Sequence, residues 1–258
     1  MKKDNLGDRM KQFYETVPKT RLMRRCPVII RLDGKSAHTF TRGFDKPFDG
    51  IFRGAMQSTM KFLCENIQGC QLGYCQSDEI TLVLIDYMNL DTQAWYDYEV
   101  QKMCSVSASM ATLEFNRAFS YFTEAMTSPQ EGENEVHHLA MRKGLMFDSR
   151  CFNVPKEEVC NVLYWRQLDA MRNSVQMIAR TLFSHKELQG KSCEEIKQMI
   201  INWKYLPWEN YPLEKQRGCC CVKGEKSWEI DYDIPIFARE RKYVNSCILW
   251  EDKNEIMD

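Results

Sequence analysis

The chain has 258 residues, a length that suits one elaborated domain with its own hydrophobic core. Hydrophobic residues make up 44% and charged residues 28%, as in an ordinary soluble globular protein, and no apolar run is long enough to span a membrane. The net charge of −1 excludes a general attraction for polyanions, so nucleic acid would need local basic patches.

The N-terminal segment MKKDNLGDRMKQFYE becomes acidic and polar after two lysines, so it is not a secretory signal and we expect a cytoplasmic protein. The 12 cysteines are scattered and contain no C-x-x-C pair, which argues against a zinc site. We expect reduced thiols that mostly fill the core. The three consecutive cysteines at 219–221 would alternate in direction along a strand, so they could not present three ligands to one ion.

Periodicity predicts a core with the element order strand, helix, strand, strand, helix, strand. In chain order the predicted elements are PVIIRL (27–32), a helix at 49–67 opened by an Asp cap, a hairpin made of LGYCQ and ITLVLID, a long helix from 93 to about 126 without Gly or Pro, and LMFDSRCFNV (145–154). This order is that of the split βαββαβ, ferredoxin-like unit, an α+β fold.

The remainder of the chain predicts two further helices and a small strand pair. A long helix, KEEVCNVLYWRQLDAMRNSVQMIARTLFSH, follows Pro155, and KSCEEIKQMIIN is started by Ser192 with acidic residues behind it. The strand pair is expected at 219–223 and 227–232. We therefore expect a single catalytic domain over 1–258, with a core at about 25–186 and a C-terminal extension at about 187–258.

Two acidic turns stand at the ends of predicted strands. YCQSDEIT places Asp78 and Glu79 side by side at the mouth of a strand, and RLDG places Asp33 at the end of the first strand. Either turn alone is explained by solvent exposure, because Ser, Asp and Gly are common turn residues. In the βαββαβ unit the first strand lies beside the hairpin, so Asp33 can face Asp78 across the sheet. Converging carboxylates suit hard divalent cations such as Mg²⁺, which offset their repulsion.

The residues after Asp33 fit phosphate binding. Gly34 permits close approach of the backbone, and KSAHTF (35–40) leaves the strand with small and hydroxyl side chains. Successive backbone N–H groups in such a turn can hold phosphate oxygens, although the Walker spacing is absent. Lys46 in FDKPFD precedes the next helix, where its charge could meet a phosphate; the alternative is a solvated loop lysine.

Basic residues occur in four short clusters that would form a nucleic-acid patch only if they share one surface. The clusters are Arg21 with Arg24 and Arg25, Arg142 with Lys143, Lys215 with Arg217, and RERK at 239–242. Each is otherwise a solvated face of the protein.

Several stretches together resemble the tRNA-histidine guanylyltransferase superfamily, most closely its branch of guanylyltransferase-like enzymes that repair tRNA 5′ ends. They are IIRLDGKSAHTFTRGFDKPFD, GYCQSDEITLVL, FDSRCFNV and YWRQLDAMRNSVQ, and the resemblance runs from about residue 6 to about 223. It implies a domain similar to the palm of ordinary polymerases that works in reverse. The 3′-hydroxyl of an incoming nucleoside triphosphate attacks an activated 5′ phosphate on the tRNA. GTP and ATP are then substrates, two Mg²⁺ ions are cofactors, tRNA is the partner, and the assembly is a homotetramer.

The resemblance also implies roles for individual residues. Asp33, the Gly34 carbonyl and Asp78 would bind two Mg²⁺ ions, with Glu79 supporting the catalytic centre. The incoming triphosphate would be held by Lys35, Ser36, Ala37, His38, Thr39 and Phe40. The activated 5′ end would face Arg31, Lys46, Ser77 and Lys102, the last placed there only by helix alignment. Further out, we expect RNA contacts from Arg24, Arg25, Arg172 and Arg217, although Arg172 is otherwise a helix-surface arginine.

One stretch departs from the family pattern. Eukaryotic guanylyltransferases carry His-x-Asn-Asn after W-R-Q-x-D, where this chain has Met171, Arg172, Asn173 and Ser174. The difference favours template-directed repair of shortened tRNA 5′ ends over obligatory recognition of histidine tRNA. The alternatives are addition of G at the −1 position of histidine tRNA, a nucleotide cyclase, whose GGDEF-like hairpin is absent, and a non-catalytic tRNA-binding relic.

Overall fold

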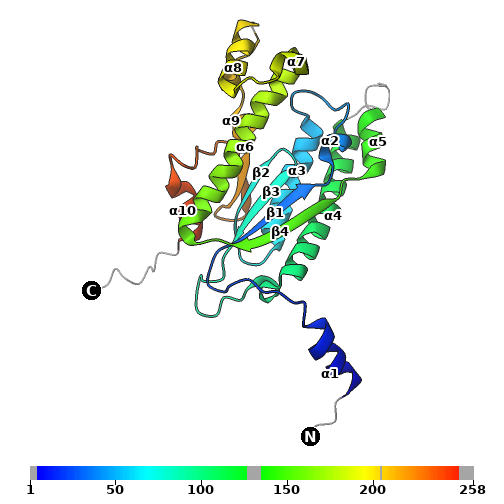
Figure 1. Ribbon diagram of the computed structural model, residues 1–258, viewed down its shortest axis with the longest axis vertical. Coiled ribbons are helices and arrows are strands. Elements are labelled where there is room, and N and C mark those ends of the chain that lie inside the picture. The colour runs from blue at the N-terminus through cyan, green and yellow to red at the C-terminus, as the bar shows by residue number, and fades with distance from the viewer. Residues whose placement is uncertain (1–4, 127–134, 204, 250–258) are drawn as a thin grey trace, which may run out of the picture.

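The computed structural model describes residues 5–126, 135–203 and 205–249. Its centre is a six-stranded antiparallel sheet with the order β4-β1-β3-β2-β5-β6 (Figure 1). The predicted core order is present, and the α+β class is confirmed. Its elements are β1 (Val28–Gly34), α2 (Ala37–Phe40), α3 (Gly50–Asn66), β2 (Cys70–Gln76), β3 (Glu79–Leu84), α4 (Val100–Met126), α5 (Glu135–Lys143) and β4 (Phe147–Asn153).

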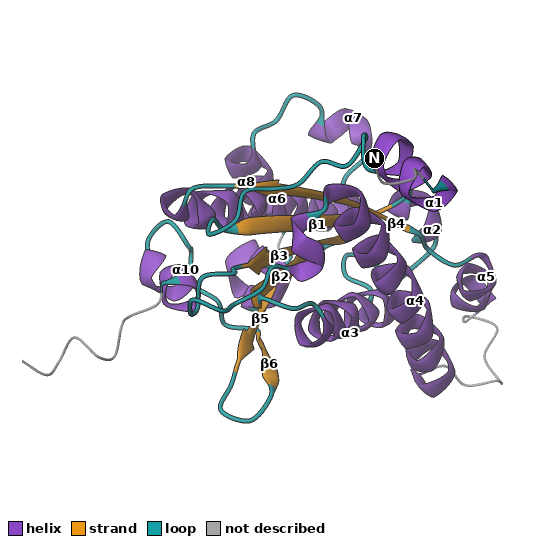
Figure 2. Cartoon of the chain, turned by 90° about the horizontal axis from the view of Figure 1, so that it is seen from below, coloured by secondary structure: helices purple, strands orange, loops and turns teal. Residues whose placement is uncertain are grey.

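The two faces of the sheet are covered by different helices (Figure 2). α3 and α4 pack on one face around Ile30 and Leu82, whereas α6 (Lys156–Leu182) and α10 (Arg241–Ile248) pack on the other around Ile29 and Val83. Neighbouring strand residues divide between the two cores because side chains alternate along a strand. This alternation places Asp33, two residues after Arg31, on the α6 face.

The C-terminal part extends both the sheet and the helical layer. β5 (Cys219–Lys223) pairs with β2, and β6 (Trp228–Asp231) pairs with β5, so the predicted strand pair is confirmed and joins the main sheet. α6 runs past the end of the sheet and packs on α8 (Cys193–Asn202) and α9 (Leu213–Arg217). Ser192 caps α8 through a capping box, as predicted. The shorter elements are α1 (Leu6–Met10), α7 (His185–Leu188), a π-helical turn at Lys11–Glu15 and 3₁₀ turns at Trp95–Tyr98 and Trp208–Asn210. The predicted extension includes residues 250–258, which lie outside the described residues.

The helix boundaries agree with the sequence in one case and differ in another. Asp49 caps α3 as predicted, accepting a hydrogen bond from the Phe52 N–H at 2.8 Å. The helix predicted from 93 is wrong at its start, because α4 begins at Val100 and residues 96–98 have positive φ angles. The Val100 N–H donates to the Thr20 carbonyl at 2.9 Å, so this segment is held by the chain that precedes β1.

The cysteine triplet alternates in direction as predicted. Cys219 and Cys221 enter the core under α3, whereas Cys220 enters the core under α6. All 12 cysteines are free thiols, and most of them are buried. None of the helices in the described ranges is long and apolar enough to cross a membrane.

Candidate active site

Acidic side chains gather at the end of the sheet nearest α2. Asp33 of β1 lies opposite Glu79 of β3 on one side and opposite Asp148 of β4 on the other. Residues directly opposite each other in neighbouring strands share a face, so the three carboxylates form a row on the α6 face. The expectation that Asp78 lies opposite Asp33 is wrong, because Ser77 and Asp78 form the hairpin turn and Glu79 begins the paired strand. Asp148 was not predicted, since nothing in FDSR distinguished it from an ordinary strand residue.

Asp78 nevertheless lies against the end of β1. The Gly34 N–H donates to the Asp78 carbonyl at 3.0 Å. A Cβ atom placed on Gly34 would lie 3.4 Å from the Asp78 Cβ and 3.2 Å from Leu145 Cδ2. The backbone bond holds the hairpin turn against the end of β1, and the Asp33 and Asp78 carboxylates lie near enough for their charges to interact.

The site carries more negative charge than its own side chains neutralise. Burial raises the pKa of the Asp33 carboxyl, and the charges of Asp78, Glu79 and Asp148 raise it further, against a smaller opposite effect of Arg150. A divalent cation that prefers oxygen ligands would offset this charge. The carboxylates of Asp33 and Asp78, with the Gly34 carbonyl, therefore fit Mg²⁺. Within the described ranges, no three His, Cys, Asp or Glu side chains converge as a ready metal site. Mg²⁺ usually takes only one or two protein carboxylates and completes its shell with water and phosphate.

Glu79 is neutralised by the protein itself. Its side chain is 5% exposed, and its Oε1 accepts a hydrogen bond from Arg166 Nε at 2.6 Å. The Nε of Arg31 lies 3.5 Å from Glu79 Oε2, and within the described structure this buried nitrogen makes no hydrogen bond. Both guanidinium groups lie over the ring of Trp165, at 4.4 Å for Arg166 and 5.6 Å for Arg31. A cation is therefore not needed to balance Glu79, which corrects the view that one metal site offsets both charges of the Asp78–Glu79 pair.

The segment 35–40 turns directly from β1 into a single helical turn. The Lys35 N–H donates to the Met146 carbonyl at 2.8 Å, and Ser36 adopts a left-handed conformation with φ of 56°. The Ser36 carbonyl accepts the Thr39 and Phe40 N–H groups. The first N–H groups of a helix have no acceptor within the helix, so those of Ala37 and His38 are suited to an anion. The exposed side chains of the segment are those of Lys35, Ser36, His38 and Thr39.

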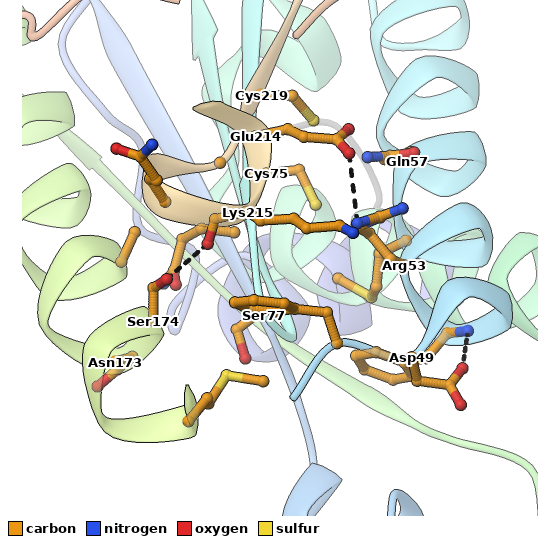
Figure 3. Close-up of a pocket in the computed structure, with 18 residues that line it drawn as sticks. Asp49, Arg53, Gln57, Cys75, Ser77, Asn173, Ser174, Glu214, Lys215 and Cys219 are labelled. Carbon is orange, nitrogen blue, oxygen red and sulfur yellow. Dashed lines mark hydrogen bonds and ion pairs between the residues drawn. The ribbon is translucent and has the colours of Figure 1, made fainter. Parts of the chain in front are cut away.

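A pocket opens beside the hairpin turn, between α3, α6 and α9 (Figure 3). It encloses about 680 Å³, counting its open mouth. Ser77, Asp49 and Asn173 line it, together with the ion pair between Arg53 and Glu214 at 3.3 Å. The exposed Lys46 lies two residues before Phe48, which also lines the pocket.

Lys102 lies elsewhere. It is in the first turn of α4. This turn lies beside the end of β4 that is remote from Asp148, because the Val100 carbonyl accepts a hydrogen bond from Cys151 Sγ at 3.8 Å. α4 covers the face of the sheet opposite to the acidic row. The Lys102 ammonium lies over the Tyr96 ring at 4.9 Å. Within this chain Lys102 therefore lies away from the acidic site, and its expected contact with the activated 5′ end has no support here.

The arginines before β1 lie at the opposite end of the sheet from Asp33 and are engaged within the chain. Arg24 Nε donates to Asp86 Oδ2 at 2.7 Å, and this carboxylate is 0% exposed. Arg25 donates to backbone carbonyls in the loop after β3, and Arg21 contacts Asp97. These arginines thus hold the loop 86–97 in place. Arg172 and Arg217 lie instead on a groove beside α6.

Known proteins resemble this chain in both sequence and fold. The family model for tRNAHis guanylyltransferase matches residues 7–155. The chain belongs to this family. A curated relative, an uncharacterized protein of Acanthamoeba polyphaga mimivirus, is 30% identical over 84% of this chain and 77% of its own length. The probable tRNA(His) guanylyltransferase of Dictyostelium discoideum is 26% identical over 78% of this chain and 77% of its own.

Solved structures agree with the family. A bacterial tRNA(His) guanylyltransferase (Thg1)-like protein in complex with ATP is 35% identical, with a TM-score of 0.84 over 96% of this chain and 100% of its own. A Thg1-like protein in complex with GTP is 34% identical, with a TM-score of 0.74 over 95% of this chain and 99% of its own. A transferase fold of the tRNA guanylyltransferase type is thereby shown for nearly the whole chain.

Proposed function

We propose that the chain is a Mg²⁺-dependent nucleotidyltransferase that extends the 5′ end of tRNA in the 3′-to-5′ direction, using the opposing base of the acceptor stem as template. The observation that carries the proposal is that Asp33 and Asp78 lie close together near the N–H groups of Ala37 and His38, in a member of the guanylyltransferase family. In this proposal the protein works in the cytoplasm as a homotetramer, and GTP and ATP are substrates.

Two Mg²⁺ ions would be held by Asp33, the Gly34 carbonyl and Asp78, and when bound they supply charge stabilisation for the attacking and leaving oxygens. Within residues 35–40, the N–H groups of Ala37 and His38 orient the incoming triphosphate, because those of Lys35, Thr39 and Phe40 are bonded to carbonyls of the chain. Arg31, Lys46 and Ser77 lie toward the activated 5′ end of the tRNA. The 3′-hydroxyl of the incoming nucleotide loses its proton to solvent, and its oxygen attacks the 5′ phosphorus to form a new P–O bond. The bond to the activating group breaks, and that group leaves with the electron pair, as AMP from an adenylylated end or as pyrophosphate from a 5′-triphosphate.

Glu79 has a supporting role in this scheme. Held by Arg166 and Arg31, it fixes the first residue of β3 and thereby the position of Asp78 in the turn before it. Asp148 adds negative charge to the same row and is itself in contact with Arg150 at 3.2 Å. The chemistry is therefore assigned to Asp33 and Asp78, and Glu79 positions them.

Templated repair is favoured over addition of G to histidine tRNA by the residues that replace His-x-Asn-Asn. Ser174 is buried and donates to the Lys215 carbonyl at 2.6 Å, and Trp208 Nε1 donates to Ser174 Oγ at 3.0 Å. Ser174, which stands where the family pattern has its second asparagine, thus links α6 to α9 in this chain.

The test uses a tRNA that lacks its first nucleotide, labelled nucleoside triphosphates and Mg²⁺. The label should enter at the 5′ end, and the added nucleotide should change when the opposing base is changed. Addition of G whatever the opposing base would instead favour the histidine-tRNA enzyme. An absence of addition with intact tRNA binding would favour the relic, and a cyclic nucleotide formed without RNA would favour a cyclase. Asp33→Asn serves as the inactive control.

A further inference from the structure

A second concave surface, which we call the α6 groove, lies beside the outer face of α6. It encloses about 1110 Å³, counting its open mouth. Four basic side chains line it, and no acidic side chain does so. The lining residues that matter here are Arg172, Lys197, Arg217 and Arg239, with Tyr164 and Trp208 as aromatic walls.

The four basic groups differ in how they are neutralised. Arg172 pairs with Asp169, and Lys197 Nζ lies 3.2 Å from Glu209 Oε1. Arg217 and Arg239 have no ion-pair partner anywhere in the described ranges. Arg239 is exposed, whereas the Nε of Arg217 is buried and makes no hydrogen bond there.

The Arg217 guanidinium is poorly compensated. Burial lowers its pKa, while Asp233 and Glu240 oppose this effect from beyond ion-pair distance. A buried donor without an acceptor destabilises a fold, and a charged donor does so more strongly. An anion with several oxygens, such as a phosphate, would satisfy the planar fork of the guanidinium.

The position of the groove connects it to the acidic site. An alternating series of charges, Arg172, Asp169, Arg166 and Glu79, runs from the edge of the groove to the start of β3. The helical rise from Arg166 to Arg172 is about 9 Å. A strand whose 5′ end lies at the acidic site can therefore reach the groove along the same helix.

We propose that the α6 groove binds a backbone phosphate of the RNA, with Arg217 and Arg239 as its ligands. This inference rests on the proposed function and adds the place where a chain of net charge −1 holds a polyanion. The alternative cluster of arginines is engaged elsewhere, because Arg24 and Arg25 are bound to Asp86 and to the loop after β3.

The test measures tRNA affinity against salt concentration, in EDTA and without nucleotide, so that it does not depend on catalysis. Arg239→Gln and Arg217→Gln should each weaken binding and reduce the log–log salt slope by about one. The matched control is Arg117→Gln, an exposed arginine of α4 on the other face, which should leave the slope unchanged. In a phosphate-ethylation interference experiment, one tRNA phosphate should block binding to the wild type when it is ethylated. Ethylation of that same phosphate should no longer affect binding to either groove variant.

Three results would overturn the proposal. The first is an unchanged salt slope in both groove variants while the wild type binds tRNA. The second is a rise in the KM for GTP with unchanged tRNA affinity, which would assign the groove to a free nucleotide. The third is a wild-type protein that binds no tRNA, which would remove the proposed function as well. Arg217→Lys controls for folding, because it retains the charge and should keep most of the salt slope.

Discussion

Glu79 and Asp33 face each other across two strands, yet neutralising them should have opposite consequences. Glu79 is 5% exposed and Arg166 8% exposed, so their ion pair is buried. Loss of one partner of a buried pair destabilises a protein by about 3–5 kcal/mol. In Glu79→Gln the amide oxygen can still accept a hydrogen bond from Arg166. The Arg166 guanidinium also retains its ion pair with Asp169, whose Oδ2 lies 2.9 Å from Nη2. We therefore expect a loss of about 2–3 kcal/mol, which in a domain of this size lowers Tm by about 4–12 °C.

Asp33→Asn should leave the fold intact or make it more stable. Burial and the neighbouring carboxylates raise the pKa of Asp33, so its charged form opposes folding at neutral pH. The neutral amide removes that repulsion. Nucleotide addition should fall by about 100-fold or more, because stabilisation of charge by the metal is worth several kcal/mol and each 1.36 kcal/mol is a factor of ten in rate.

Thermal unfolding in EDTA and in Mg²⁺, beside single-turnover nucleotide addition, separates the two roles. Mg²⁺ should raise the Tm of the wild type and of Glu79→Gln, but not that of Asp33→Asn, because only the last loses a metal ligand. The reasoning is refuted if Glu79→Gln melts with the wild type in EDTA. It is equally refuted if Asp33→Asn unfolds several degrees earlier, or keeps its response to Mg²⁺.

Three further substitutions follow from the structure. Gly34→Ala should lower nucleotide addition more than stability, because its Cβ would lie 3.2 Å from Leu145 Cδ2 and 3.3 Å from Ala37 Cβ and would shift the start of α2; a wild-type rate would contradict this. Arg24→Ala should lower the free energy of unfolding, measured in denaturant, by about 1–3 kcal/mol, because the Asp86 carboxylate is 0% exposed and loses the Arg24 Nε at 2.7 Å. The salt dependence of tRNA affinity should stay unchanged in this variant, as expected if Arg24 does not contact the RNA. Lys102→Ala should leave the single-turnover rate unchanged, and a large loss of rate would return Lys102 to the active site.

The parts of the fold that sequence predicted are those with a strong local signal. The strands of the core alternate or run apolar between turn residues, and the caps at Asp49 and Ser192 use side chains whose chemistry is local. The start of α4 was mispredicted because the absence of Gly and Pro favours a helix over 93–99. Arg21 and Arg24, far away in sequence, bind Asp97 and hold that segment in a turn with positive φ angles.

The site was predicted less completely, for the same reason. Asp33 and Asp78 are visible because each ends or begins a strand at a turn. Asp148 is brought beside Asp33 only by the register of β4, and Arg166 reaches Glu79 only because α6 crosses that face. Neither spacing is local. The sequence predicted a metal as the partner of Glu79, whereas in the structure its partner is Arg166. The pattern of charges along the sequence could not reveal this contact.

The missing His-x-Asn-Asn pattern has been replaced by a packed contact, so restoring it should not restore the family's histidine-tRNA behaviour. Ser174 is buried between α6 and α9, where it donates to the Lys215 carbonyl and accepts from Trp208. The Ser174 hydroxyl makes both bonds from one atom beside an open pocket, whereas an asparagine amide would have to place its oxygen and its nitrogen at two separate points. Losing one of these buried hydrogen bonds destabilises by about 1–3 kcal/mol. We expect Met171→His with Ser174→Asn to unfold at a lower temperature than Met171→His alone, and to keep choosing the nucleotide by the opposing base. A double variant that is as stable as the single one and adds G opposite every base would show that the contact is dispensable and that these positions set the specificity.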